Sequence, residues 1–82
     1  MTHAEIMRTL EDIFRDVLDD DAIELTRATQ AGDIDGWDSQ AHVSLIVAAE
    51  MRFGVRFRTA ELDGLHDVGA FADLIHQKLA SA

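Results

Sequence analysis

Apolar residues recur at three- and four-residue intervals in separate segments of this chain, and that spacing places them on one side of an α-helix. In the first segment these residues are Ile6, Leu10, Ile13 and Val17, with charged residues at most positions between them. The sequence contains no proline, so none of the segments is interrupted by a helix breaker. The pattern therefore predicts an all-α fold in which helices pack their apolar sides together.

Capping residues predict where the two longest helices begin and end. Thr2 and Glu5 have the spacing of a capping box, so the first helix should begin there. It should end near Leu18, because the acidic run that follows is unfavourable at the negative end of a helix dipole. Residues 39–53 form the second helix, which Gly54 can close in a left-handed conformation. Apolar residues lie almost all round this second helix, which predicts packing on more than one side.

A short helix and a longer last helix complete the expected fold. Thr59 can cap a short helix that reaches Leu65, and Asp67 can cap a last helix from Val68. The buried side of the last helix should consist of Phe71, Leu74, Ile75 and Leu79. We therefore expect residues 1–82 to form a single domain, a four-helix bundle with three long helices and one short third helix.

The segment between the first and second helices is the unusual part of the pattern. A loop of this length is rare in a small domain unless apolar side chains pin it or it has a function. The side chains expected to pin it are Ile23, Leu25, Ile34 and Trp37.

Size and charge limit the function. A chain of 82 residues has too small a core to enclose a deep cavity with a polar active site, so a carrier or an interaction module fits better than an enzyme. Seven basic residues against sixteen acidic ones leave a net charge of −9. This charge repels nucleic acid and anionic lipid, so we expect neither nucleic acid nor membranes as partners. Proteins with basic patches, docking transiently, are the expected partners.

The absence of cysteine excludes disulfides, thiolate metal sites and a cysteine nucleophile, so any thiol must come from a cofactor. The N-terminus has no basic region followed by an apolar run, and no stretch is long enough to span a bilayer. Nothing resembles a long self-complementary stripe. We expect a cytoplasmic monomer.

Chemistry is expected at Asp38 and Ser39, where the second helix starts. Serine and aspartate are common helix caps, so capping alone can explain the pair. The wider pattern changes this interpretation. The residues that resemble the modification segment and second helix of acyl carrier proteins are Asp38, Ser39, Val43, Leu45, Ile46, Ala48, Glu50, Phe53, Gly54 and Val55. Residues 61–62 resemble the short third helix of that family, and residues 68–75 resemble its last helix.

The resemblance implies that Ser39 is the attachment site of 4'-phosphopantetheine, which a transferase takes from coenzyme A. The terminal thiol of this arm would carry acyl groups as thioesters, so the implied partners are the phosphopantetheinyl transferase and acyl-loading and acyl-processing enzymes. A helix start also suits the phosphodiester physically, because it offers amide donors and the positive end of a dipole. Asp38 would start the helix and present Ser39 to a transferase that uses magnesium.

The sequence departs from the family on the surface that partners would meet. Gln40 stands where leucine is usual. Second-helix positions that are acidic in many members hold Ala41, His42, Ser44, Met51 and Arg52. We therefore expect a dedicated carrier in a specialised fatty-acid, polyketide or secondary-metabolite pathway. The residues expected to contribute to docking are Trp37, Gln40, His42 and Glu61.

Several alternatives stay open on sequence alone. Ser39 could simply cap a helix of an unmodified acidic interaction module. The chain could also be a peptidyl carrier with aminoacyl cargo, although only Gly36 precedes the serine where peptidyl carriers more often have a glycine pair. Trp37 either anchors the loop in the core or offers an exposed surface. A small basic patch around Gly54 either contacts an acidic partner or offsets nearby acids; it consists of Arg52, Arg56 and Arg58.

Two other kinds of site are rejected. Asp38, Ser39 and His42 do not suit a hydrolase triad, because an aspartate adjacent to the serine cannot readily orient the histidine from its far side. Asp33 and Asp35 before Gly36 lack the ligand pattern of an EF-hand, which leaves open only loose calcium binding at this loop, and the histidines have no compact metal-ligand spacing. We expect neither catalysis nor a metal site.

Overall fold

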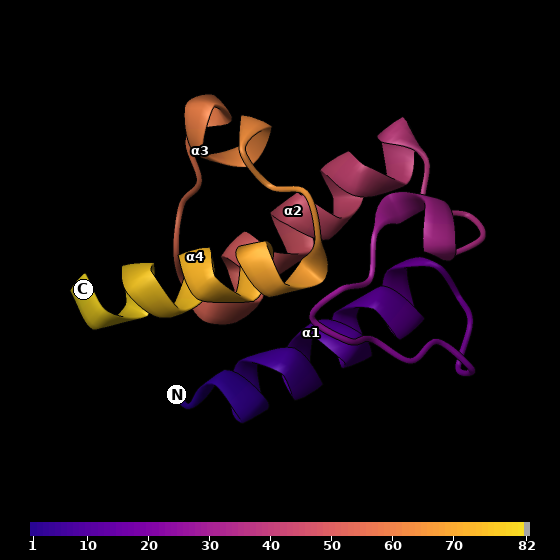
Figure 1. The fold of residues 1–82 in the computed structure, drawn as a ribbon, viewed down its shortest axis with the longest axis horizontal. Helices are drawn as coiled ribbons and strands as arrows, with labels where there is room; N and C mark the ends of the chain where they lie inside the picture. The colour runs from indigo at the N-terminus through magenta and orange to yellow at the C-terminus, as the bar shows by residue number, and fades with distance from the viewer. Residues whose placement is uncertain (82) are drawn as a thin grey trace.

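The computed structural model describes residues 1–81 and is built from helices, with no strand among these residues. The helices are α1 (His3–Val17), α2 (Ser39–Phe53), α3 (Thr59–Asp63) and α4 (Val68–Ser81), with a 3-10 turn η1 (Ala31–Asp33) before α2. α1 packs against both α2 and α4, while α3 lies on the connection between α2 and α4 (Figure 1). The expected four-helix fold is confirmed. No helix within residues 1–81 combines the length and the apolar character needed to cross a bilayer.

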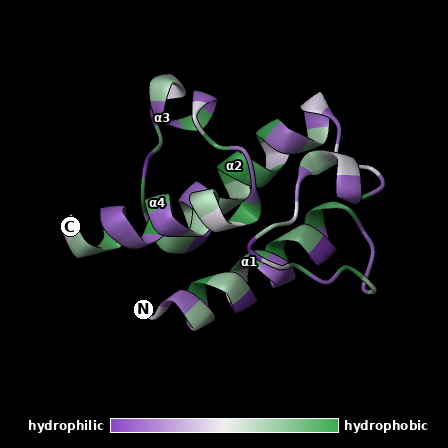
Figure 2. Cartoon of the chain, viewed as in Figure 1, coloured by the Kyte–Doolittle hydropathy of each residue, from purple (hydrophilic) through white to green (hydrophobic). Residues whose placement is uncertain are grey.

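The core contains the apolar residues that the helical spacing singled out. Hydrophilic and hydrophobic segments alternate along α1 and α4, as expected for amphipathic helices that bury one side (Figure 2). Each large buried side chain contributes about 1.5–3 kcal/mol relative to an exposed one. The largest fully buried side chains are Phe14, Ile6, Leu10, Leu45, Ile75 and Val68.

The helix ends largely follow the expected capping residues. The Thr2 hydroxyl accepts from the Glu5 backbone N–H at 3.2 Å, and the Glu5 carboxylate accepts from the Thr2 N–H at 2.9 Å, so the capping box is confirmed. Gly54 closes α2 with φ of 68° in the left-handed region. The Asp67 carboxylate accepts from the Ala70 N–H at 2.8 Å, as expected for the cap of α4.

The expected cap and end of the short helix were wrong. Arg58, not Thr59, precedes the first turn of α3, and the helix ends at Asp63 rather than at Leu65. The carboxylate of Glu61 accepts from the Arg58 backbone N–H at 2.8 Å. The side chain that caps the start of this helix is therefore a glutamate in its first turn and not the expected threonine.

The long segment between α1 and α2 is pinned by both apolar and polar contacts. Ile23 is buried, and Leu25, Ile34 and Trp37 pack partly against the core, as expected. The Glu11 carboxylate accepts from the Leu25 N–H at 2.9 Å. The Arg15 Nε donates to the Ile23 carbonyl at 2.8 Å. The 3-10 turn η1 was not expected there, because three residues carry no recognisable periodicity.

The same segment is joined to the start of α4 by backbone hydrogen bonds. The Val68 N–H donates to the Thr29 carbonyl at 2.9 Å, and the Gly69 N–H donates to the Arg27 carbonyl at 2.8 Å. A Cβ at position 69 would lie 2.8 Å from that carbonyl oxygen, closer than van der Waals contact allows. Glycine at this position therefore lets the loop and α4 approach closely.

We expect Gly69→Ala to lower the free energy of unfolding by about 1–3 kcal/mol, because the added methyl group must push the loop backbone away from α4. Chemical denaturation followed by circular dichroism measures the change. Gly32→Ala is the matched control, since a Cβ at position 32 meets nothing within 4 Å. Equal losses in both variants would contradict the close approach.

One expectation about α2 was wrong. Val43, Val47 and Met51 are 62%, 47% and 80% exposed, so one side of α2 faces solvent and is apolar. The buried residues of α2, which are Leu45, Ile46, Ala49 and Phe53, belong to the core shared with α1 and α4, so the side that carries Val43, Val47 and Met51 is left unpacked. We call these three residues the apolar ridge.

Candidate functional site

Asp38 caps α2 with both its side chain and its backbone. The Asp38 carboxylate accepts from the Ala41 N–H at 2.8 Å. Its carbonyl accepts from the His42 N–H at 2.9 Å, which closes the first turn. The cap position of α2 is therefore occupied by Asp38, and Ser39 is the first residue inside the helix.

Ser39 is exposed, and its hydroxyl makes no hydrogen bond to any of residues 1–81. The backbone N–H groups of Ser39 and Gln40 likewise donate to no acceptor in that part of the chain, as is usual in the first turn of a helix. An accessible hydroxyl therefore stands beside amide donors at the positive end of the α2 dipole. These residues fit a phosphodiester-linked group, because the site offers an attachment oxygen and is favourable for an anion.

The loop before Ser39 turns at Gly36. Gly36 has φ of 87°, a left-handed conformation that favours glycine. Its carbonyl accepts from the Asp38 N–H at 3.1 Å, and the Trp37 N–H donates to the Ile34 carbonyl at 3.3 Å. This tight turn brings the chain directly from η1 into the cap of α2.

Trp37 anchors this turn to the core. Its indole meets Phe14 edge-on, with ring centroids 4.8 Å apart and an interplanar angle of 89°. Phe14 is only 1% exposed, so the loop is fixed to the centre of the bundle. On its other side the indole Nε1–H donates to Nδ1 of His42 at 3.2 Å. Of the two roles considered for Trp37, the anchoring contact is the one present in the fold.

The remaining docking candidates occupy two separate places. Trp37 and His42 line a hollow of about 380 Å³ together with Ser39, and the exposed Gln40 follows Ser39 in the first turn. Glu61 lies elsewhere: it pairs with Lys78 at 2.9 Å and lines a hollow with Gly54 and Arg56. The structure therefore gathers Trp37, Gln40 and His42 near Ser39, whereas Glu61 ties α3 to α4.

Lys78 and the Arg58 backbone N–H hold the pKa of Glu61 below its ordinary value of 4.5. A lowered pKa means that the folded state favours the ionised carboxylate. This stabilisation is fully present above the unfolded value and is lost as the pH falls through the folded pKa.

We expect Glu61→Gln to reduce the midpoint of chemical denaturation at neutral pH, and the difference from wild type to shrink below about pH 4.5. Denaturation curves collected from neutral to acidic pH measure this convergence. Asp63→Asn on the same helix is the control, since Asp63 is exposed and forms no ion pair within residues 1–81. A Glu61→Gln difference that does not change with pH would contradict the ion-pair explanation.

The groups that a hydrolase triad would require are engaged elsewhere. The Asp38 carboxylate is bonded to the Ala41 N–H, and Nδ1 of His42 accepts from Trp37. In a triad the aspartate would accept from that same Nδ1. The sequence-based rejection of a triad agrees with this arrangement.

Sequence reasoning missed how the one acidic residue of α2 is used. The Glu50 carboxylate accepts from the Phe57 backbone N–H at 2.9 Å, where the chain runs from α2 toward α3. Glu50 therefore stabilises a connection. The outer side of α2 carries instead the apolar ridge, with the exposed Arg52 and Arg56 near its C-terminal end.

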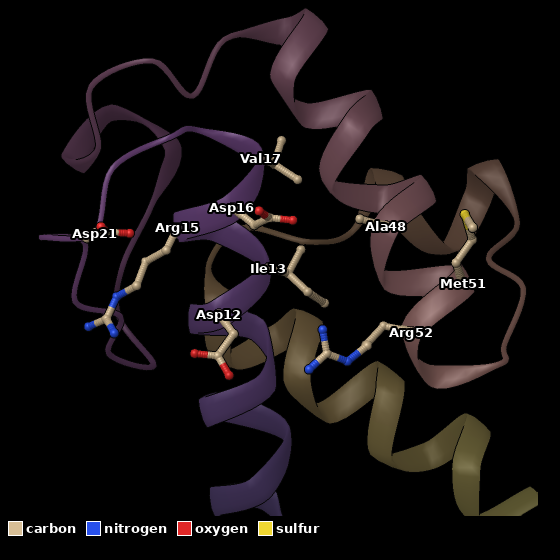
Figure 3. A pocket seen from close by; sticks show the side chains of 9 residues that line it. All are labelled: Asp12, Ile13, Arg15, Asp16, Val17, Asp21, Ala48, Met51 and Arg52. Atoms are coloured by element: carbon tan, nitrogen blue, oxygen red, sulfur yellow. The ribbon is translucent and has the colours of Figure 1, made fainter.

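A cleft between α1 and α2 does not include Ser39. It measures about 760 Å³ and lies between α1 and α2, and Figure 3 shows Ile13 and Val17 on one side with Ala48, Met51 and Arg52 on the other. Acidic residues of α1 and the following loop also line it. Ala48, the lining residue of α2 nearest to Ser39 in the sequence, is therefore separated from Ser39 by more than two helical turns.

The fold and the exposed serine at the start of α2 define a small helical carrier domain. No protein-family model and no curated protein matches the chain. Among solved structures, the chain is similar to the solution NMR structure of a holo acyl carrier protein from Geobacter metallireducens. The two are 49% identical, with a TM-score of 0.88, over 93% of this chain and 87% of the other. The chain belongs to the acyl carrier protein family.

Proposed function

We propose that this chain carries 4'-phosphopantetheine on Ser39 and presents acyl groups as thioesters to partner enzymes. The observation that carries the assignment is the division of roles at the start of α2. Asp38 caps the helix, and the Ser39 hydroxyl is exposed without a hydrogen bond to residues 1–81. The similar Geobacter protein is described in its holo form, which supports the presence of the arm.

The attachment reaction is a phosphoryl-group transfer from coenzyme A. The Ser39 oxygen forms a bond to the phosphorus that bears the pantetheine, and the bond from that phosphorus to the adenosine 3',5'-bisphosphate breaks. The serine proton passes to a base of the transferase. When bound, the arm supplies a thiol, which this cysteine-free chain lacks.

The family membership and the cap geometry favour this proposal over an unmodified interaction module. In such a module Ser39 would be present as the cap, yet the cap position belongs to Asp38. An aminoacyl group would be carried on the same serine and the same arm. The attachment chemistry is therefore common to both kinds of carrier, and an acyl group is the expected cargo.

The surface of α2 supports a dedicated carrier of a specialised pathway. Its ridge of Val43, Val47 and Met51 is apolar and exposed, and its single acid, Glu50, is bonded to the Phe57 N–H. Arg52 and Arg56 are exposed and form no ion pair with any of residues 1–81. A partner that docks along this helix therefore meets an apolar strip that ends in positive charge.

The helix geometry gives the partner a length scale. Arg52 lies thirteen positions after Ser39, which corresponds to about 20 Å along the helix axis. We propose that partner enzymes of this carrier place carboxylates at roughly that distance from the entrance that receives the arm. The basic patches expected from the net charge of −9 should therefore meet other parts of the carrier, because a basic patch at this end of α2 would repel Arg52 and Arg56.

The proposed function is tested by loading the purified protein. The apo-protein is incubated with magnesium, a broad-specificity phosphopantetheinyl transferase and either coenzyme A or an acyl-coenzyme A, and its intact mass is measured. We expect one arm per chain, and with acyl-coenzyme A an acyl group that hydroxylamine releases. No mass gain with several transferases would favour the unmodified module.

A further inference from the structure

The pair formed by Trp37 and His42 determines which nitrogen of the histidine carries a proton. The indole Nε1–H donates to His42 Nδ1 at 3.2 Å, and the two rings lie nearly parallel at 19° with centroids 6.1 Å apart. An indole nitrogen can only donate, so Nδ1 must accept. A neutral imidazole with an accepting Nδ1 carries its proton on Nε2.

The orientation of this histidine is fixed from the core outward. Trp37 packs edge-on against the buried Phe14, with centroids 4.8 Å apart. His42 in turn sits one helical turn into α2 and is half-buried. The chain of contacts from Phe14 through Trp37 to His42 holds the imidazole ring in one position.

The oriented imidazole lies beside the attachment serine. Ser39 and His42 are three residues apart on α2, and residues at this spacing occupy the same side of a helix about 5–6 Å apart at Cβ. Both line the hollow of about 380 Å³ that also includes Ala31, Trp37 and Asp38. The Asp38 carboxylate is bonded to the Ala41 N–H, so the imidazole is the side-chain donor available in this hollow.

We propose that His42, oriented by Trp37, binds the phosphodiester of the group attached to Ser39 through its Nε2–H. This inference rests on the proposed function. The contact adds a side-chain donor to the amides of the first turn, so that the beginning of the arm lies over the indole side of α2. Trp37 is a positioning residue for His42 and does not need to touch the arm.

A second hollow near the start of α2 is the other place where the phosphodiester of the arm could lie. It lies on the other side of the α2 start, and Asp38 lines both hollows. The other residues that line the second hollow are Val17, Leu18, Gly36, Gln40, Ala41 and Ser44. The side-chain groups there include the Gln40 amide, whereas the Trp37 side offers a donor held in place by a second hydrogen bond. We therefore assign the arm's phosphodiester to the Trp37 side.

Nuclear magnetic resonance of the loaded protein tests the contact directly. The apo- and holo-forms are labelled with ¹⁵N, and the His42 ring nitrogens and the ³¹P signal of the arm are recorded at a pH where the ring is neutral. We expect Nδ1 to report an acceptor in both forms, the Nε2–H signal to shift on loading, and the ³¹P signal to differ from that of free phosphopantetheine.

Substitutions at position 42 distinguish hydrogen-bond donation by His42 from the mere presence of an aromatic ring there. His42→Phe keeps a ring and removes the donor, so its ³¹P signal should move to the free value. His42→Gln can place an N–H near the position of Nε2 and should restore much of the shift. Trp37→Phe removes the orienting hydrogen bond and should reduce the response of His42 to loading, even if His42→Phe fails to fold.

The outcomes distinguish this inference from the proposed function. A protein that accepts no arm gives no ³¹P signal and no added mass, which overturns the proposed function and this contact together. Loaded wild-type protein whose His42 signals equal those of the apo-form, and whose ³¹P shift equals that of the loaded His42→Phe variant, overturns the contact alone. A shift in wild type that Phe abolishes and Gln restores supports it.

Discussion

A Ser39→Ala variant is expected to accept no phosphopantetheine under conditions in which the wild-type protein is fully loaded. Alanine removes the one atom that forms the bond to phosphorus, so the effect is a complete loss rather than a reduced rate. The fold should be retained, because Asp38 supplies the cap of α2 and the Ser39 hydroxyl bonds to none of residues 1–81. Intact mass and circular dichroism measure the two expectations.

Ser44→Ala is the matched control for this experiment. Ser44 is also exposed on α2, and its hydroxyl contacts the Gln40 carbonyl at 3.5 Å. This variant should load like wild type. Loading that survives Ser39→Ala but fails in Ser44→Ala would move the attachment site, and loss of helical signal in Ser39→Ala would mean that the serine has a structural role.

Reversing the charges at the C-terminal end of α2 should exchange one class of partner for another. The Arg52→Glu/Arg56→Glu variant replaces two positive charges by two negative charges where the apolar ridge ends. With an acyl-transferring enzyme whose docking patch is rich in lysine and arginine, we expect kcat/KM to rise by about tenfold, because encounter between opposite charges is faster. Most of this gain should disappear in high salt.

The complementary exchange uses the same enzyme with basic residues of its docking patch changed to glutamate. Wild-type carrier should now be the better substrate, and the charge-reversed carrier the poorer one. Arg8→Glu is the control for net charge against the single variant Arg52→Glu, which changes the net charge equally, since Arg8 is exposed on α1 and forms no ion pair within residues 1–81. Identical kinetics for all carriers with both enzymes would exclude this end of α2 from the interface.

Light scattering of the free carrier measures its oligomeric state and shows whether a second copy of the chain covers the apolar ridge. A concentration-dependent dimer of wild type that Met51→Glu dissolves would assign the apolar ridge to a second copy of this chain instead of an enzyme. A monomer at all concentrations leaves the ridge available for partners, as the proposed function requires.

The helices were predictable because their signals are local. The spacing of Ile6, Leu10 and Ile13 reports a buried side, and each of these residues lies in the core. The capping box at Thr2 and the closing Gly54 were predictable for the same reason. Such features depend on residues a few positions apart, which a sequence shows directly.

Features that depend on how side chains are oriented in the folded chain could not be predicted. Nothing in the sequence indicates that Glu50 bonds to the Phe57 N–H, or that the Trp37 indole bonds to His42. The exposure of Met51 was equally hidden, because an apolar residue in a helix looks alike whether it faces a neighbour or solvent. Ser39 could be singled out as the candidate attachment residue through a motif, while the apolar ridge of α2 became visible only in the fold.

Fragmentation of a single peptide from the loaded wild-type protein is the most direct test of the central claim. Cleavage after Arg27 and Arg52 releases residues 28–52, which include both Ser39 and Ser44. We predict one phosphopantetheine on this peptide, with every fragment that contains Ser39 carrying the added mass and fragments beginning after Ser39 unmodified. Added mass on fragments that begin after Ser39, or an unmodified peptide from a protein of increased mass, would contradict attachment at Ser39.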